Sequence, residues 1–326
     1  MRTGLTVVVL ALSTGAAFCQ NSASNMIVGA GYSTPVPVNV APGQLMTLFV
    51  RGVGQSLTQP VAAARDGNLP KSLAGISVTL RQGSDLPVPI LEVRPVSTCI
   101  DASQAGCGTL TAITVEIPFE IQTLCPLCER PVGTPQAELF VSEDGTSGAL
   151  IGLNPFDDQV HILTSCDTVV PNAMPGLNLT GLPCPPVVTH GDGSLVSSTN
   201  PAKPGEQIVA YAVGLGKTNP AVATGEISST SAPTVSNFAL DFNFRPNALP
   251  AKPLPQSTTG DPPPPIAPIF TGLTAEYAGL YQINFLAPQA PPGTPSCGNA
   301  VQSNLTVSIG GAFSFDGAGI CIAVSP

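Results

Sequence analysis

The chain has 326 residues, and its 11 basic and 20 acidic side chains give a formal net charge of −9. This acidic balance argues against nucleic-acid binding, which needs a basic face to displace counterions. The chain contains 33 glycines and 36 prolines, while charged residues make up only 10%. Because proline and glycine break helices and mark turns, this composition predicts short strands joined by many loops, and the length predicts two domains.

The N-terminus has the pattern of a secretory signal peptide over residues 1–19. A basic residue precedes an apolar run from Leu5 to Ala17, and cleavage is predicted near Cys19 and Gln20. The run is shorter than the roughly 20 residues that a membrane-crossing helix needs, and no later stretch has that character. Acylation of Cys19 would make a lipoprotein, but the bulky Phe18 before it disfavours this alternative. We therefore expect a secreted or extracytoplasmic protein without a transmembrane segment.

Eight short stretches of alternating or clustered apolar residues predict strands. In "ITVEI", for example, the two isoleucines and the valine share one face, which predicts a strand buried on that side, with Thr114 and Glu116 on the other. In chain order the predicted strands are Leu45–Val50, Ile76–Leu80, Ile113–Ile117, Ala137–Val141, Ile208–Val213, Phe238–Phe244, Tyr281–Phe285 and Leu305–Ile309. Their spacing is typical of β-sandwiches, so we expect an all-β protein with Pro/Gly-rich loops.

The two halves resemble each other. Val40–Gln55 aligns with Ala202–Lys217, because each has a Pro-Gly turn, a strand and a Gly-x-Gly exit. Thr111–Glu120 aligns with Gly279–Pro288, each an alternating strand ended by proline. Neither Gly-x-Gly exit precedes a helical pattern or a Lys-Ser/Thr pair, so turn glycines are favoured over a phosphate-binding loop. Two tandem copies of one β-unit are the simplest explanation.

Two stretches, Gly191–Glu226 and Phe270–Pro288, resemble the uncharacterised C-terminal domain family of secreted acidobacterial proteins, the Solibacter-type domain, and more distantly the IPT/TIG modules. The resemblance covers most of Gly191–Pro326, and Met26 to about Leu163 looks like a divergent copy. It implies an immunoglobulin-like (Ig-like) sandwich in an extracellular setting and no assigned activity. The chain departs from the family pattern in its cysteines and in the Pro-rich insertion Arg245–Pro265.

Together these patterns predict four parts. Residues 1–19 form the signal peptide, and residues 26–165 form a divergent Ig-like β-sandwich. Residues 166–187 form a disulfide-closed connector, and residues 188–326 form an Ig-like β-sandwich of the Solibacter type. The fold class is thus all-β, with two tandem Ig-like β-sandwich domains.

After the signal peptide the chain has an even number of cysteines, which in an exported protein indicates a disulfide framework. They are Cys99, Cys107, Cys125, Cys128, Cys166, Cys184, Cys297 and Cys321. Their grouping suggests sequential pairs: 99 with 107, 125 with 128, 166 with 184, and 297 with 321.

The motif Cys-Pro-Leu-Cys at Cys125 and Cys128 has two interpretations. A redox centre needs a thiolate, which a helix N-terminus or a neighbouring cation stabilises. Pro131 and Pro135 stand where that helix would run, although Arg130 supplies a cation. A structural disulfide is therefore favoured over a thiol–disulfide centre.

Other candidate sites are weaker, and we predict no catalytic, cofactor-binding or metal-binding residues. His161 lies in a predicted strand and His190 in a loop, and neither has a second histidine at metal-ligand spacing. A Ser-His-Asp triad lacks a G-x-S-x-G motif. Asp157, Asp158 and Asp192 are interpreted as solvated turn carboxylates rather than calcium ligands.

These observations favour a non-catalytic exported binding or structural protein whose partner is an unknown protein or a surface glycan. One alternative is a thiol–disulfide protein that uses Cys125 and Cys128. Another is a carbohydrate-binding module, which the 5% aromatic content without tryptophan weakens. The Pro-rich insertion is interpreted as a stiff, solvated loop rather than a polyproline ligand for a partner.

Overall fold

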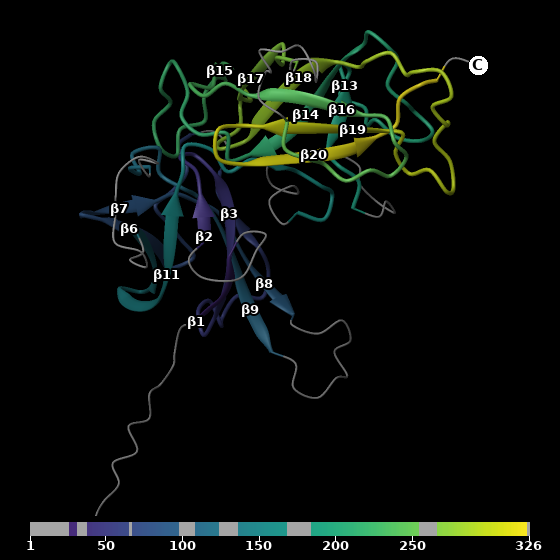
Figure 1. The fold of residues 1–326 in the computed structure, drawn as a ribbon. Helices are drawn as coiled ribbons and strands as arrows, with labels where there is room; N and C mark the ends of the chain where they lie inside the picture. The colour runs from purple at the N-terminus through teal and green to yellow at the C-terminus, as the bar shows by residue number, and fades with distance from the viewer. Residues whose placement is uncertain are drawn as a thin grey trace, which may run out of the picture.

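The computed structural model describes residues 26–30, 38–64, 67–97, 108–123, 136–167, 184–253 and 266–324. In these ranges the regular secondary structure consists of β-strands, without any helix, which confirms the all-β prediction. All eight strands predicted from the sequence are present, with bounds that differ by a few residues at most. The strands form two two-layered units, one from each half of the chain, which lie one above the other in Figure 1.

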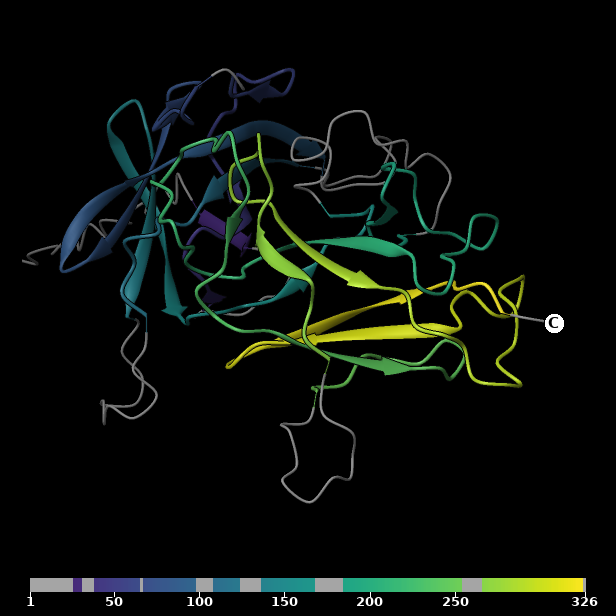
Figure 2. The same ribbon diagram turned by 90° about the horizontal axis from the view of Figure 1, so that it is seen from above.

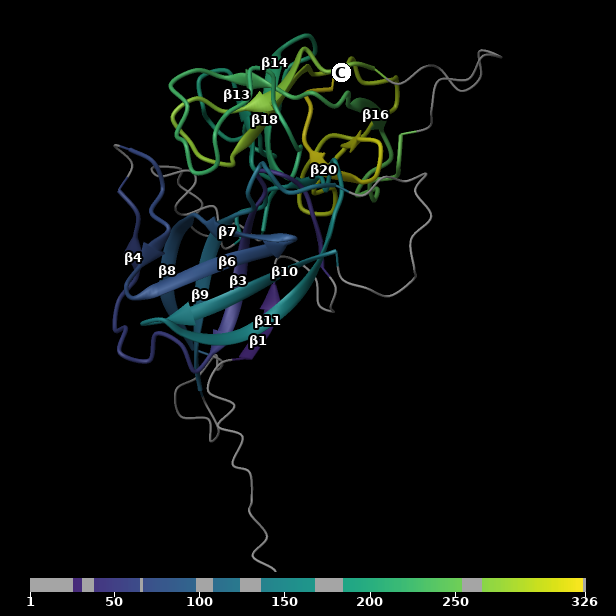
Figure 3. The ribbon, with the colours of Figure 1, turned by 90° about the vertical axis from the view of Figure 1, so that its left-hand side faces the viewer.

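The first half forms two facing sheets (Figure 3). One sheet has the order β1-β3-β9-β8-β4, and the other has the order β2-β11-β10-β6-β5 with β7 paired to β6. Inward-facing aliphatic side chains, such as Ile76, Val78 and Leu80 of β6, fill the space between the sheets. The strands are β1 (Met26–Ala30), β2 (Val38–Val40), β3 (Leu45–Arg51), β4 (Val61–Ala62), β5 (Ser72–Leu73), β6 (Ile76–Gln82), β7 (Ser84–Val88), β8 (Ile90–Ser97), β9 (Thr109–Glu116), β10 (Ala137–Glu143) and β11 (Thr146–Pro155).

The second half also forms two sheets (Figure 2). The larger has the order β12-β14-β18-β17-β15 with β13 paired to β14, and the smaller has the order β16-β19-β20. Ile208, Ile283 and Phe285 from the larger sheet pack against Val307 and Ile309 from the smaller. The strands are β12 (His161–Ile162), β13 (Val188–His190), β14 (Gln207–Val213), β15 (Ala232–Pro233), β16 (Ala239–Asn243), β17 (Phe270–Leu273), β18 (Tyr281–Leu286), β19 (Leu305–Gly310) and β20 (Phe315–Ile320).

The chain crosses between the units before residue 165, the boundary expected from the sequence. β12 lies inside the range 26–165, yet its hydrogen bonds go to β14 of the second unit. The Gly-x-Gly after β14 permits this crossing, because a Cβ on Gly214 would lie 2.0 Å from the carbonyl oxygen of Gln159. Glycine is needed at such a close backbone approach.

The strand pairing aligns the two halves differently from the sequence comparison. Leu45 of β3 pairs with Glu116 of β9, and Gln207 of β14 pairs with Leu286 of β18. When these two pairs are superposed, Glu116 corresponds to Leu286, whereas the sequence alignment matches it with Asn284. The alignment of Thr111–Glu120 therefore shifts by two residues. The shift brings the two strand-ending prolines, Pro118 and Pro288, into register.

A shared apolar cluster joins the two units. Leu45 and Leu91 from the first unit lie in one buried cluster with Val213 and Leu280 from the second. Beside it, the Leu69 amide of the first unit donates to the Gly225 carbonyl of the second at 2.8 Å, and the Gly225 amide donates to Glu116 Oε2 of the first at 2.5 Å. The units therefore meet through a packed, hydrogen-bonded joint rather than a loose linker.

Residues 247–253, called the covering segment below, lie across the outer face of β19 and β20. The Ala251 amide donates to Ser308 Oγ at 3.1 Å, and Thr306 Oγ1 donates to the Ala248 carbonyl at 2.7 Å. These contacts explain why every residue of β19 is buried, although only one of its faces is on the sandwich core. The segment has no regular secondary structure, and its exposed residues are Asn247, Leu249, Ala251 and Lys252. This part of the Pro-rich insertion is therefore a solvated loop that also packs on the sheet, and residues 254–265 lie outside the described residues.

Candidate functional site

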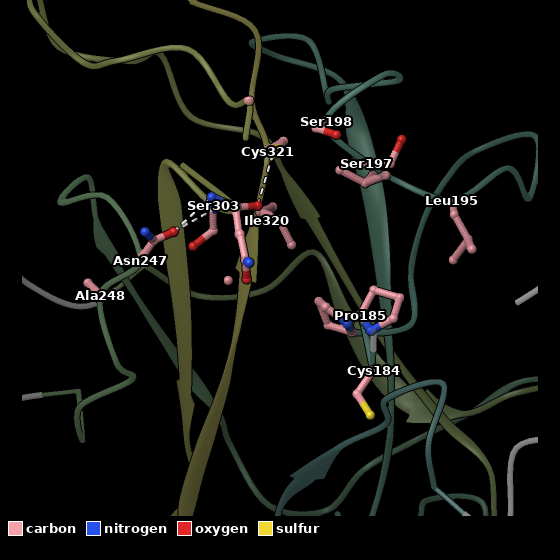
Figure 4. Close-up of a pocket in the computed structure, with 15 residues that line it drawn as sticks. Cys184, Pro185, Leu195, Ser197, Ser198, Asn247, Ala248, Ser303, Ile320 and Cys321 are labelled. Carbon is pink, nitrogen blue, oxygen red and sulfur yellow. Dashed lines mark hydrogen bonds between the residues drawn. The ribbon is translucent and has the colours of Figure 1, made fainter. Parts of the chain in front are cut away.

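A cavity of about 430 Å³ lies in the second unit, beside the C-terminal end of β20 (Figure 4). One wall consists of the C-terminal end of β20 and the loop before β19, and the other consists of residues 184–186 and 195–198. Its apolar lining comes from Pro185, Pro186, Leu195, Val196 and Ile320. Its polar lining comes from Ser197, Ser198, Asn247, Gln302 and Ser303. Below it is called the neutral pocket, because no charged side chain lines it.

Two disulfides brace the walls of the neutral pocket. Cys184 is bonded to Cys166 on one side, and Cys321 is bonded to Cys297 on the other. These are two of the pairs expected from the sequence. The other four cysteines, Cys99, Cys107, Cys125 and Cys128, lie outside the described residues.

Asn247 shapes the wall near β19. Its Oδ1 accepts hydrogen bonds from the Gln302 and Ser303 amides at 2.8 and 3.2 Å (Figure 4), and its Nδ2 donates to the Ala300 carbonyl at 3.0 Å. The residue has a left-handed backbone with φ of 53°, which asparagine tolerates better than most residues. One side chain thus fixes the loop before β19 to the covering segment.

Ser303 places a hydroxyl at the pocket wall. The residue is only 7% exposed, and a Cβ on Gly319 would lie 2.8 Å from its Oγ, so glycine is needed opposite it. Its hydroxyl has no hydrogen-bond partner among the residues that the structure describes. The hydroxyl is not among the sealed-off polar atoms without a partner in the described chain, so it is open to the cavity, where a ligand can hydrogen-bond to it.

His190 lies beside a second cavity of about 420 Å³. The sequence placed it in a loop, but it is the last residue of β13 and only 8% exposed. Its Nδ1 lies 2.6 Å from Glu206 Oε1 and its Nε2 lies 3.1 Å from the Asn200 carbonyl oxygen. Since both ring nitrogens are engaged, neither is free to bind a metal or to activate a nucleophile. The hydroxyl of nearby Ser194 donates to Asp192 Oδ1 at 2.7 Å and not to the His190 ring.

His161 clamps β12 to β20. Its Nε2 lies 3.0 Å from Asp167 Oδ2 and its Nδ1 lies 3.1 Å from Asp316 Oδ2. Burial alone lowers the pKa of His161, but the hydrogen bonds to the two carboxylates outweigh it and raise the pKa to about 9. The ring is therefore a charged structural link at neutral pH, which makes it unsuitable as a general base.

Asp158 was predicted to be a solvated turn carboxylate, and the structure contradicts this prediction. It is fully buried, and it accepts hydrogen bonds from the Ala312 amide at 2.8 Å and from the Ser314 amide and hydroxyl at 2.8 and 2.6 Å. Its carboxylate thus holds the turn between β19 and β20 instead of facing solvent. Asp157 is exposed and accepts a hydrogen bond from the Thr123 hydroxyl.

The outer face of β9 was predicted to be open, and it is buried instead. Thr114 and Glu116 are each only 1% exposed, although the alternating pattern predicted one open face. Glu116 Oε2 accepts a hydrogen bond from the Gly225 amide at 2.5 Å, so the second unit covers it. Burial raises the pKa of Glu116 to about 8, against the opposing effect of this hydrogen bond.

In the described ranges no group of three or more histidine, cysteine or carboxylate side chains is arranged so that it could hold a metal ion. A third cavity of about 490 Å³ lies between the units, at residues 67–68, 227–229 and 276–277. Nowhere in the described chain does a helix reach the length and apolar character that crossing a bilayer requires.

Comparison with models of protein families, with curated proteins and with solved structures found no match. The resemblance to the Solibacter-type domain therefore stays a prediction from the sequence. The pocket residues Ser198, Asn247, Ser303 and Gly319 were not predicted. Only the pair Gly317 and Gly319 carried a signal, because glycine inside a strand often marks a close backbone approach.

Proposed function

We propose that the protein is a non-catalytic, exported binding protein built of two Ig-like units related to the Solibacter-type domain, and that the neutral pocket holds its ligand. The observation that carries the proposal is a braced cavity that combines apolar walls with uncharged hydrogen-bonding groups, among them the unpartnered hydroxyl of Ser303. Such a mixture of apolar walls and a few polar groups is typical of ligand sites.

Several features support this role. The two disulfides are compatible with an extracytoplasmic location, where thiols are oxidised. The packed joint between the units keeps the pocket in a fixed orientation with respect to the first unit. The uncharged lining favours an uncharged ligand, because a buried charge without a partner is strongly disfavoured. The ligand is then a neutral part of a protein or of a surface glycan.

The experiment is a calorimetric binding screen of the full chain against neutral oligosaccharides and capped peptides, each with a charged counterpart. Ser198 is exposed at the pocket rim, so Ser198→Arg should fill the opening without disturbing the fold. Ser229→Arg, at an exposed serine of the third cavity, is the matched control. We expect a neutral ligand whose affinity falls at least tenfold in Ser198→Arg and stays unchanged in Ser229→Arg. The proposal is rejected if Ser198→Arg leaves the binding unchanged, or if no member of the panel binds.

A further inference from the structure

The neutral pocket contains an unpaired strand edge. β20 is the last strand in the order β16-β19-β20. Just beyond it, the Cys321 carbonyl accepts a hydrogen bond from the Ala202 amide at 2.9 Å, and the Ala323 amide donates to the Ala202 carbonyl at 2.8 Å. Cys321 and Ala323 therefore direct their backbone groups away from β19.

The backbone N–H and C=O of Gly319 also point away from β19. In an extended chain every second residue directs its N–H and C=O toward the same edge. The opposite set fits this alternation, because the Ile320 carbonyl accepts a hydrogen bond from the Asn304 amide at 3.1 Å on the β19 side. Side chains keep the same period, with Ala318, Ile320 and Ile322 all in the core.

Neighbouring groups occupy the edge on both sides of Gly319. Toward the C-terminus, Ala202 bridges to Ile322. Toward the N-terminus, the Ile162 amide of β12 donates to Asp316 Oδ2 at 2.9 Å, and the Gly317 amide donates to Asp316 Oδ1 at 2.8 Å. Between them, the N–H and C=O of Gly319 face the pocket, and no described residue pairs with them along this edge.

We propose that the neutral pocket binds a short, extended and uncharged peptide segment that adds to the free edge of β20 by pairing with Gly319. Strand addition of this kind takes its affinity from backbone hydrogen bonds and its specificity from pockets for alternate side chains. One set of side chains would meet the apolar wall at Leu195 and Val196, and the other set would meet Ser198 and Ser303. No aromatic ring lines the pocket for sugar stacking, which favours a peptide over a glycan. This inference rests on the proposed function.

The test uses acetylated and amidated tetrapeptides made of Ala, Val, Ser and Thr, with Glu- and Lys-containing counterparts. The tightest neutral peptide is then N-methylated at one residue at a time. Pairing with Gly319 predicts an alternating pattern, in which methylation of the N–H that faces the edge weakens binding about tenfold or more and methylation of the next residue has little effect. Ser303→Ala should weaken binding severalfold, and Ser229→Arg should leave it unchanged.

The outcomes separate this inference from the proposal beneath it. Equal effects of N-methylation at every position, or no neutral peptide that binds, would overturn the strand addition. If neutral peptides fail but a neutral oligosaccharide binds and Ser198→Arg abolishes its binding, the proposed function stands and the peptide inference is wrong. If no member of either panel binds, both fail.

Discussion

Glu116 is a carboxyl group buried where the two units meet. The Gly225 amide is its hydrogen-bond donor. Its ionisation also interacts electrostatically with Glu120 and Tyr281. Burial raises the pKa of Glu116 to about 8, so the group is mainly protonated at neutral pH. The joint between the units is therefore closed around a neutral acid.

This pKa predicts a pH dependence of stability. The folded pKa of about 8 lies above the ordinary value of 4.5 for a glutamate side chain, so the folded state binds the proton more tightly than the unfolded state. The resulting stabilisation is complete below pH 4.5, is lost as the pH rises to about 8, and stays lost above it. Glu116→Gln mimics the protonated form, so we expect its free energy of unfolding to exceed that of the wild type by about 5 kcal/mol above pH 8.

Urea unfolding between pH 5 and pH 9 checks this prediction. Glu276→Gln is the control, because Glu276 is exposed and is not among the groups that shift the pKa of Glu116. The control should keep the pH slope of the wild type. An unchanged slope in Glu116→Gln would show that Glu116 ionises normally.

At the scale of elements, the covering segment and the smaller sheet depend on glycine. A Cβ on Gly317 would lie 2.5 Å from Pro250 Cβ and 2.6 Å from the Val307 carbonyl oxygen. Gly317→Ala should therefore displace the covering segment and lower the free energy of unfolding by about 1–3 kcal/mol. Gly191→Ala is the control, since a Cβ there meets nothing within 4 Å. Equal stability of the two variants would mean that the covering segment packs loosely.

The same elements show how far the sequence can predict the fold. Strands with alternating or clustered apolar residues, such as β6 and β18, were found because their own side chains define a buried face. β20, with the sequence "FDGAGI", could not be delimited from the sequence because its two glycines and aspartate give no apolar alternation. It is a strand through its pairing with β19 and its contact with the covering segment. Glu116 was assigned to an open face because the covering unit lies more than 100 residues away in sequence.

The candidate site was less predictable than the fold. Cysteine grouping pointed to the two disulfides that brace the neutral pocket, because each pair encloses a short loop. The pocket itself combines three separate segments, around Ser198, Asn247 and Ser303, whose meeting depends on sheet packing. Asp158 could not be assigned from sequence either, since its hydrogen-bond donors at residues 312–314 follow more than 150 residues later.

At the scale of the whole molecule, the joint predicts that the two units unfold together. Tyr281 of the second unit is fully buried at the joint, where a Cβ on Gly43 of the first unit would lie 2.7 Å from its hydroxyl, and this hydroxyl donates to the Gly216 carbonyl of its own unit. Tyr281→Phe leaves that carbonyl without its donor, so we expect a loss of about 1–2 kcal/mol in one cooperative transition. Tyr277→Phe, at a partly exposed tyrosine, should cost much less. Two separate transitions in the wild-type calorimetric scan would show that the units are independent.

The cysteines give a second prediction at this scale. A binding protein with structural disulfides should show no free thiol after export, and all of its bridges should resist mild thiol buffers. Mass-spectrometric peptide mapping during a graded reduction checks this. Selective opening of a Cys125–Cys128 bridge at a mild potential would instead favour the thiol–disulfide alternative.

The most direct measurement is amide hydrogen exchange of the full chain, with and without the tightest ligand from the binding screen. Our account predicts protection at residues 195–198, 302–303 and 319–321, which line the neutral pocket, and no change at residues 227–229 of the third cavity. Protection at the third cavity alone, or none at the neutral pocket, would contradict the claim that this pocket is the binding site.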